Sequence, residues 1–248
     1  MRISLASQAY LHDARQFSSQ RLINQYAEKA PPDARAPIIL RATPGTTSFC
    51  DLATGPVRGM KAVGSKLYVA AGSSVFSVTT AGTATNRGTI VPSQDYVDVI
   101  ENPSQLMIAA GTTGYTYTLA TDTLAQISDS DFPGATSALY IDGYGLVAKP
   151  SSAQMNLSSL LDFSAWAALD SSTETTAPDN VIAVRDDRKE FWAFGSQTIV
   201  PYSRTGTGTF PFERVSQVIL EMGLIAQWSA VAMDNSCLLY TSPSPRDA

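Results

Sequence analysis

Few side chains in this sequence could perform chemistry, and the most reactive types are scarce. The chain has one histidine, His12, and two cysteines, Cys50 and Cys237. A catalytic thiol needs a neighbouring base, and His12 is the only histidine that could serve one. Two cysteines and one histidine cannot form a four-ligand zinc site or a disulfide framework. We therefore expect a structural role for His12, and for Cys50 a place as a small buried hydrophobic side chain.

Acidic residues occur in two short clusters, Asp129 with Asp131 and Asp186 with Asp187. A glycosidase needs two carboxylates that face each other across a cleft. The first cluster lies between two repeat units, and the second lies in a hairpin turn. We expect both clusters to be solvated turns.

Glycine-rich stretches at Gly111–Gly114 and Gly206–Gly208 could cradle a phosphate. Neither ends in the Gly-Lys-Ser/Thr sequence of a phosphate loop, and neither opens a predicted helix. Turns explain both stretches better. The sequence therefore predicts no catalytic, cofactor-binding or metal-binding residues, and no cofactor.

The composition excludes several classes of protein. The 248 residues carry a net charge of −5, with 44% hydrophobic and only 16% charged residues. Abundant Ser, Thr, Gly and Pro argue against a helical bundle, and the low charge argues against disorder. No apolar run approaches the ~18 residues of a membrane span, and the first residues do not resemble a secretory signal. Mild acidity gives no basic patch for binding duplex DNA.

A repeated segment organises most of the chain. Each copy is an apolar strand that ends at a Gly or Pro: Leu67–Gly72, Leu106–Gly111, Leu146–Pro150 and Phe191–Gly195. The terminal residues of these copies are separated by 39, 39 and 45 positions. A period near 40 residues with three or four short strands is typical of a propeller blade.

Each repeat also has an upstream apolar strand and a polar turn. The upstream strands are predicted at Gly59–Val63, Tyr96–Ile100, Ala138–Ile141 and Val181–Val184. We therefore predict an all-β fold, a propeller-like array of about four 40-residue blades in an incomplete ring. The small Ala-Ala-Gly segments suggest strands close to the axis. Aromatic residues at strand spacing are predicted to pack between blades, or some of them against a partner subunit: Tyr115, Tyr117, Trp192, Phe194 and Tyr202.

Three domains are predicted: an N-terminal arm (1–45), the truncated blade array (46–236) and a C-terminal tail (237–248). In the arm, apolar spacing predicts a short helix over Ser19–Ala30, before a strand at Ile38–Leu40. A helical turn is expected within Ser158–Trp166, and a polar linker over Ser171–Asn180.

The tail breaks the pattern of the repeats. Residues Cys237–Asp247 match, residue for residue, the in-frame translation of a common transposase sequencing adapter. We expect the natural protein to continue beyond Asn235 or Ser236 and the tail to be an assembly artefact.

Several short motifs occur in a recognisable order. They are Asn24-Gln25-Tyr26-Ala27-Glu28, Arg41-Ala42-Thr43-Pro44-Gly45, Val57-Arg58-Gly59-Met60, Gly195-Ser196-Gln197-Thr198-Ile199 and Glu221-Met222-Gly223-Leu224-Ile225-Ala226. In this order, over residues 17–226, the chain resembles the packaged-DNA stabilisation proteins of short-tailed phages, also called tail accessory or hub proteins. The resemblance is strongest over residues 179–226.

This resemblance implies a structural virion protein of a β-propeller family and no enzyme. Such proteins form a ring, usually of six subunits, beneath the portal and adaptor of the phage head. They close the DNA channel after packaging and provide a platform for the tail needle and tailspikes. The resemblance implies assembly in the host cytoplasm, packaged DNA that passes without tight binding, and no membrane partner.

Two other classes of function stay open. A propeller enzyme, such as a glycan hydrolase or lactonase, would need paired carboxylates or a metal at the central channel. A generic propeller that binds a protein partner in a cell would need neither. Portal and terminase genes beside this one would favour the tail role.

Overall fold

The computed structural model describes residues 10–11, 19–20, 23–34, 37–174, 179–187, 190–216, 218–233 and 236–239. His12 and residues 240–248 of the predicted tail lie outside the described residues. All regular elements in the described part of the chain are strands. None of its elements is a helix long and apolar enough to span a membrane. The chain divides into two compact units, Met1–Phe49 and Cys50–Ala248.

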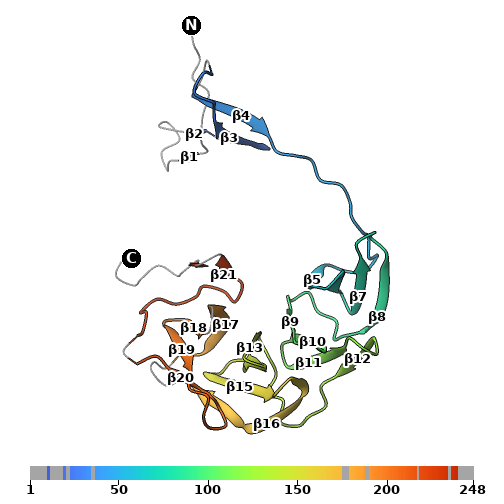
Figure 1. Cartoon of the computed structure of the whole chain (residues 1–248), viewed down its shortest axis with the longest axis vertical. Coiled ribbons are helices and arrows are strands. Elements are labelled where there is room, and N and C mark those ends of the chain that lie inside the picture. The colour runs from blue at the N-terminus through green and yellow to red at the C-terminus, as the bar shows by residue number, and fades with distance from the viewer. Residues whose placement is uncertain are drawn as a thin grey trace. The chain divides into compact units, whose positions relative to one another are not determined.

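The second unit contains four antiparallel sheets of four strands each (Figure 1). Sheet 1 comprises β5 (Val57–Val63), β6 (Lys66–Ala71), β7 (Ser74–Thr79) and β8 (Ala84–Thr89). Sheet 2 comprises β9 (Asp98–Glu101), β10 (Gln105–Ala110), β11 (Thr113–Thr118) and β12 (Thr123–Gln126). Sheet 3 comprises β13 (Ser137–Ile141), β14 (Tyr144–Ala148), β15 (Gln154–Ser159) and β16 (Asp162–Thr173). Sheet 4 comprises β17 (Val181–Asp187), β18 (Glu190–Gly195), β19 (Ile199–Arg204) and β20 (Phe212–Arg214).

The hydrophobic core lies between neighbouring sheets. The middle strands are buried on both faces, as in β10 and β15, because each sheet is covered on either side. Buried residues of sheets 3 and 4 form the largest cluster, which includes Leu146, Met155 and Phe191. A second cluster joins sheets 2 and 3. A single sheet could not bury both of its faces, so stacking of the repeats supplies the core.

The first strand of each sheet is its innermost strand. β5 packs beside β9, β9 beside β13, and β13 beside β17, so these four strands surround a common axis (Figure 1). This is the β-propeller arrangement that the 40-residue period predicts. The Ala-Ala-Gly segments instead end β6 and β10, the second strands of their sheets. The expectation that they line the axis is wrong.

A fifth sheet begins after sheet 4. β21 (Ala230–Met233) pairs with β22 (Ser236–Leu239) and lies beside β17. β22 therefore includes the first residues of the predicted tail. The segment 215–229 leads from the outer strand β20 to β21, and its described residues, 215–216 and 218–229, form only turns, bends and isolated bridges.

Two local expectations in the blade array are corrected. Ser158–Trp166 contains no helical turn, because β15 ends at Ser159 and β16 begins at Asp162 after a two-residue turn. The predicted linker over Ser171–Asn180 begins inside β16, whose last residue is Thr173; residues 175–178 lie outside the described residues. β16 is bulged against β15, because Ser158 pairs with Trp166 and Asn156 with Ser171.

The first unit contains two small antiparallel pairs. β1 (Tyr10–Leu11) pairs with β2 (Ser19–Gln20), and β3 (Gln25–Lys29) pairs with β4 (Ile38–Ala42). The predicted strand at Ile38–Leu40 is confirmed. The predicted helix over Ser19–Ala30 is wrong, because Gln25–Lys29 takes its hydrogen bonds from β4, a partner that apolar spacing alone does not show.

Candidate functional site at the propeller axis

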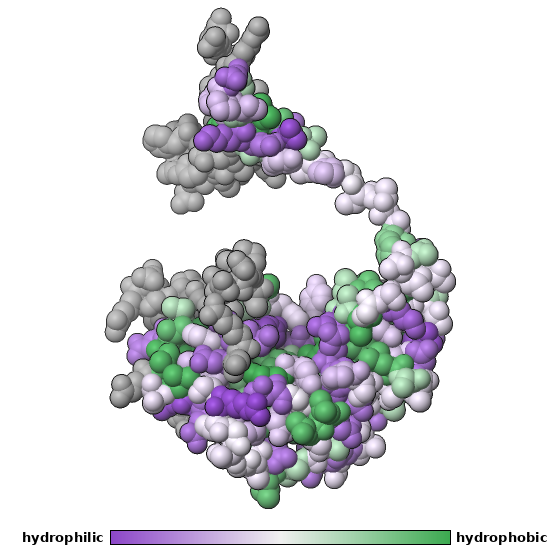
Figure 2. All heavy atoms as spheres, viewed as in Figure 1, coloured by the Kyte–Doolittle hydropathy of each residue, from purple (hydrophilic) through white to green (hydrophobic). Residues whose placement is uncertain are grey.

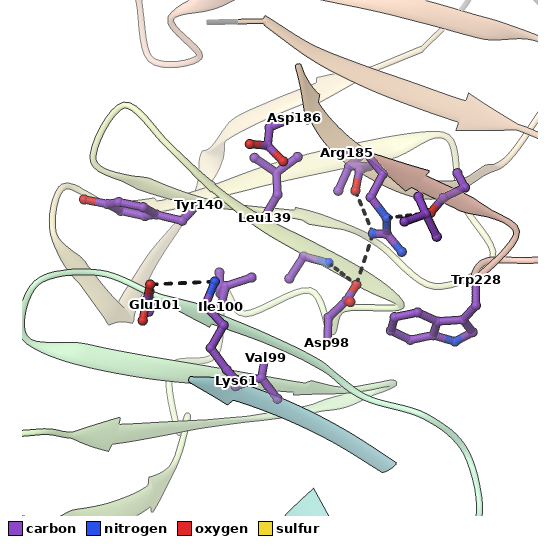
Figure 3. Close-up of a pocket in the computed structure, with 14 residues that line it drawn as sticks. Lys61, Asp98, Val99, Ile100, Glu101, Leu139, Tyr140, Arg185, Asp186 and Trp228 are labelled. Atoms are coloured by element: carbon purple, nitrogen blue, oxygen red, sulfur yellow. Dashed lines mark hydrogen bonds and ion pairs between the residues drawn. The ribbon is translucent and has the colours of Figure 1, made fainter. Parts of the chain in front are cut away.

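A cavity of about 430 Å³ opens at the axis, between the innermost strands (Figure 3). Its walls come from β5, β9, β13, β17 and the start of β21. Charged side chains from three sheets reach it, which makes it the first place to look for chemistry: Lys61, Asp98, Glu101, Arg185 and Asp186.

Arg185 of β17 is held in this site by contacts with the protein itself. Its Nη1 atom donates to Ser137 Oγ and to the carbonyl oxygen of Val184, at 2.8 Å each. Its Nε and Nη2 atoms donate to the carbonyl oxygens of Ala230 at 3.4 Å and Gln227 at 3.3 Å. All three guanidinium nitrogens are therefore used within the protein.

Two further groups complete the surroundings of Arg185. The carboxylate of Asp98 on β9 forms an ion pair with Nη1 at 3.5 Å, and the indole of Trp228 lies 5.4 Å from the guanidinium carbon. A guanidinium at this distance from an indole ring gains a cation–π attraction. Figure 3 shows Asp98, Arg185 and Trp228 grouped on one side of the cavity.

Asp98 is held on its other side by backbone. Its Oδ2 atom accepts a hydrogen bond of 2.9 Å from the amide of Ala138 on β13. Burial raises the pKa of the Asp98 carboxyl, and the charge of Arg185 and the hydrogen bonds offset that rise only in part. Burial is therefore the dominant influence on the pKa of this carboxyl.

The open side of the cavity is more solvated. Lys61 of β5 and Glu101 of β9 form an ion pair of 3.7 Å, with side chains that are about two-fifths exposed. Tyr140 and the exposed Asp186 border the same space. Among the described residues, no group of three Asp, Glu, His or Cys side chains is placed to hold a metal ion.

These contacts define an axis node, consisting of Asp98, Ser137 and Arg185. The node joins sheets 2, 3 and 4 to the segment that leads into β21. Its hydrogen-bonding groups are turned toward one another and toward backbone carbonyls. This arrangement fixes the positions of the neighbouring sheets relative to one another.

A second buried carboxylate, Asp179, anchors sheet 4 at the turn between β18 and β19. It is only 7% exposed. Its oxygens accept hydrogen bonds from the amides of Ser196 (2.8 Å), Gln197 (2.7 Å) and Thr198 (3.0 Å), and from both hydroxyls of that turn. Burial alone would raise the pKa of Asp179, but these hydrogen bonds together lower it.

Two glycines allow this turn to be packed so closely. A Cβ atom on Gly195 would collide with the Asp179 carboxylate, and one on Gly223 would collide with the backbone of Ser196. Leu224 donates its amide to the carbonyl oxygen of Gly195 at 2.9 Å and is buried. The two sequence motifs that contain Gly195 and Gly223 therefore dock onto each other, which explains both as packing elements.

The Arg58-Gly59 motif has a similar basis in sheet 1. Arg58 is 2% exposed and donates to the carbonyl oxygens of Gly72, Val91 and Asp95 at 2.7–2.9 Å. A Cβ atom on Gly59 would collide with the carbonyl oxygen of Val97. The motif therefore fastens β5 to the connection that leads into β9.

The structure does not bring the two acidic clusters together. Asp129 and Asp131 accept hydrogen bonds from the amides of Trp166 (2.9 Å) and Ala168 (3.3 Å) on β16, the outer strand of sheet 3. Residues 129–131 lie in a turn, as expected, with Asp131 exposed, and both carboxylates also bind the edge of β16. Asp186 and Asp187 end β17, the innermost strand of sheet 4, so their place in a turn is corrected.

The other candidates take structural places. Cys50 is half-buried against the cluster that contains Val69 and Phe76. Gly111, Gly206 and Gly208 have φ values of 72–82° and serve turns, whereas Gly114 lies in β11, where a Cβ atom would crowd Phe132. The aromatic residues pack in the core as predicted, four of them buried and one half-buried: Tyr115, Tyr117, Phe194 and Tyr202, with Trp192.

Sequence analysis missed Asp98, Arg185 and Asp179, whose polar contacts hold the axis node and the turn after β18. A signal for the first two was present. Asp98 is a charge within an apolar strand, and Arg185 directly follows the apolar residues 181–184. A charge in such a place needs a partner. No local pattern marks Asp179, because its partners lie 17–19 positions further along the chain.

Comparison with known protein families identifies the family to which this fold and these motifs belong. The model of the family described as bacteriophage P22 Gp10, β-propeller, matches residues 1–247. The chain belongs to this family of phage packaged-DNA stabilisation proteins. A search of curated proteins finds no match to the sequence.

Solved structures share the fold at low identity. YCF48 bound to D1 peptide matches with a TM-score of 0.51 and 9% identity, over 75% of this chain and 61% of that one. The extracellular domain of the putative one-component system BT4673 from B. thetaiotaomicron matches with a TM-score of 0.50 and 14% identity, over 82% and 29%. The chain thus spans less than two thirds of either structure. These likenesses concern the propeller fold alone.

Proposed function

We propose that this protein is a non-enzymatic subunit of a phage tail hub. In this role it forms a homo-oligomeric ring, six subunits in our proposal, beneath the portal and adaptor proteins. It closes the portal channel, retains the packaged DNA and carries the tail needle and tailspikes. The observation that carries the proposal is the match of the phage stabilisation family over residues 1–247.

The axis node supports a structural role. Every guanidinium nitrogen of Arg185 is used by the protein's own acceptors, so this side chain has few hydrogen-bond donors left for a substrate. A glycan hydrolase needs two carboxylates that face each other. In the described residues, the two acidic clusters lie apart, one at the outer edge of sheet 3 and the other at the inner edge of sheet 4.

The charge of the blade array supports passage of DNA without tight binding. Cys50–Ala248 contains eleven Lys and Arg residues against nineteen Asp and Glu residues. An acidic surface repels phosphates, and duplex binding depends on neutralising them. We expect binding of a short duplex to be weak and nearly independent of salt concentration.

Retention of DNA by phage heads tests the proposal directly. Packaged heads assembled without this protein, but with portal and adaptor, should lose DNA to added nuclease. Adding the purified protein should protect the DNA and should produce ring-shaped density below the portal in electron micrographs. Unchanged nuclease sensitivity after binding would contradict the role in stabilisation, and failure to bind portal–adaptor heads would contradict the place in the hub.

The absence of enzymatic activity is tested separately. A panel of glycan and lactone substrates should show no turnover by the protein. Any turnover that disappears in the quadruple variant D129N/D131N/D186N/D187N would favour the enzyme, because these residues form the two acidic clusters.

A further inference from the structure

The two units of the chain carry opposite net charge. Met1–Phe49 contains six Lys and Arg residues against three Asp and Glu residues, whereas Cys50–Ala248 contains eleven against nineteen. The net charges are therefore +3 and −8. Charges of opposite sign on two surfaces steer them together and disfavour contacts between like surfaces.

The β3–β4 hairpin of the first unit leaves apolar side chains in solvent. Ile23, Tyr26 and Ile38 are 65%, 43% and 43% exposed. Figure 2 shows hydrophobic and strongly hydrophilic residues side by side on this hairpin. An isolated two-stranded hairpin is at best marginally stable in water, so a covering surface would stabilise it.

The blade array also has a surface that exposes large apolar side chains to solvent. The segment between β20 and β21 exposes five large apolar side chains by 36–52%, which we call the apolar ridge: Val218, Ile219, Met222, Ile225 and Trp228. Its backbone is fixed by the docking of Leu224 and Gly223 on the turn after β18. Apolar residues so closely spaced on a held surface mark interaction sites.

Acidic groups border the apolar ridge. Glu221 is exposed within it, and the exposed Asp95 adjoins Tyr96, whose ring contacts that of Trp228 at 5.8 Å. The ridge therefore combines apolar contacts with negative charge, which suits a partner that is apolar and basic.

We propose that the β3–β4 hairpin of one copy docks on the apolar ridge of a second copy of this chain. The inference rests on the proposed homo-oligomer and names the surfaces that build it. The hairpin itself has a net charge of +1, with Arg41 paired to Glu28 at 2.7 Å and Lys29 exposed, beside its exposed apolar side chains. DNA would satisfy only the positive charge. A contact between two different surfaces of identical subunits is heterologous, and such contacts close rings when the rotation fits.

Substitutions on the ridge test the proposal. The variant M222D/I225D of the full chain should raise the dissociation constant for self-association at least about tenfold, as loss of interface anchors does. L169D is the matched control, because Leu169 is 81% exposed on β16 and lies outside the ridge. Sedimentation velocity measures association, and near-UV circular dichroism shows that both variants are folded.

A charge reversal on the hairpin tests the same contact from the other side. K29E should weaken association several-fold at low salt and much less at 0.5 M salt, because screening removes long-range attraction. K66E, on the blade array, is the control of equal charge change. An equal effect of both variants would contradict the assignment of the contact to the hairpin.

Disulfide trapping tests whether the hairpin of a second copy binds the apolar ridge. In a C50A/C237S background, chains carrying I38C are mixed with chains carrying I225C and a different tag. We expect a disulfide-linked pair that contains both tags. If cross-linking occurs only within a chain that carries both substitutions, the hairpin covers its own ridge and the second copy is the wrong occupant.

The remaining outcomes separate this inference from the proposed function. A ring that survives M222D/I225D and K29E unchanged would overturn the hairpin contact and leave the hub intact. A wild-type chain that stays monomeric at all concentrations, also on portal–adaptor heads, would overturn the ring and with it this contact. Binding of a 30-base-pair duplex that K29E abolishes, with association unaffected, would assign the hairpin to DNA.

Discussion

Asp98 and Asp179 are both buried carboxylates that hold sheet 4, and they do so in opposite ways. Asp98 meets the cation of Arg185, the hydroxyl of Ser137 and one backbone amide, and burial raises its pKa. Asp179 meets three amides and two hydroxyls of one turn, and its pKa is lowered. The two carboxylates differ in how far charge and hydrogen bonds offset burial, which is only in part at Asp98 and more than fully at Asp179.

The difference also separates local from long-range anchoring. Asp179 fixes a single turn, from Ser196 to Thr198, within its own sheet. Asp98 belongs to the axis node, which connects three sheets and the segment before β21. The first contact shapes a loop, and the second sets the spacing of sheets around the axis.

Removal of the Asp179 side chain should give the largest effect. D179A removes the acceptor of three amides in the half-exposed turn at Ser196–Thr198, and hydrogen bonds to charged groups contribute about 1.5–3 kcal/mol each. We expect a loss of about 4 kcal/mol or more in the free energy of unfolding, measured with urea. D142N, at an exposed ion pair with Arg204, is the control and should change stability by less than about 0.5 kcal/mol. Equal losses would remove the distinction between the turn contact and a surface pair.

Loss of the cation in the axis node should rank second. R185M leaves Asp98 buried without its partner and frees the carbonyl oxygens of Gln227 and Ala230, so we expect a loss of about 3 kcal/mol. Asp98 can take up a proton in this variant, which limits the cost. Hydrogen exchange should also accelerate across 227–233. The control K61A breaks the solvated ion pair with Glu101 and should cost less than about 0.5 kcal/mol.

A substitution at Gly223 that crowds the turn at Ser196–Thr198 should have a smaller effect on stability. G223A places a methyl group against the backbone of Ser196, and overpacking of this kind costs about 1–3 kcal/mol. Proteolysis should then cut 215–229 more readily, because this segment is held through the turn. G45A meets no atom within 4 Å and serves as the control. Wild-type stability of G223A would mean that the turn does not hold the segment.

The sequence supports prediction of the blades much better than prediction of these anchors. Leu67–Gly72 and Leu106–Gly111 identify β6 and β10 because buried strands are apolar and their turns need glycine. The fourth strands β8 and β12 escape such a search, because an outer strand is exposed and its residues are mostly polar. The helix predicted over Ser19–Ala30 fails for a related reason, since pairing with β4 outweighs local spacing.

The anchors depend on contacts between distant parts of the chain. Asp98 and Arg185 are separated by 87 positions, so no spacing rule links them. The motifs around Gly195 and Gly223 are visible in the sequence, but their purpose is clear only once the two segments are seen to dock. The hydrogen-bond partners of these buried polar side chains come from distant segments of the chain, whereas the strand pattern of about 40 residues can be recognised within each repeat.

The dependence of stability on pH should distinguish the two carboxylates by sign, although it is the smallest effect. The pKa of Asp98 is raised above the ordinary value of 3.8, so the native state binds this proton more tightly than the unfolded state does. Its contribution to stability therefore falls as the pH rises from 3.8 through the raised pKa. The pKa of Asp179 is lowered, so its contribution is present above pH 3.8 and is lost as the pH falls through the lowered pKa.

Urea titrations of the wild type, D98N and D179N between pH 3 and 7 measure both signs. The advantage of the wild type over D179N should grow with rising pH, because the ionised Asp179 is the form that the turn stabilises. The advantage over D98N should shrink over the same range, because burial opposes the ionised Asp98. Equal slopes for the two variants would show that the ion pair with Arg185 offsets burial after all, and the axis node would then stabilise its carboxylate as the turn does.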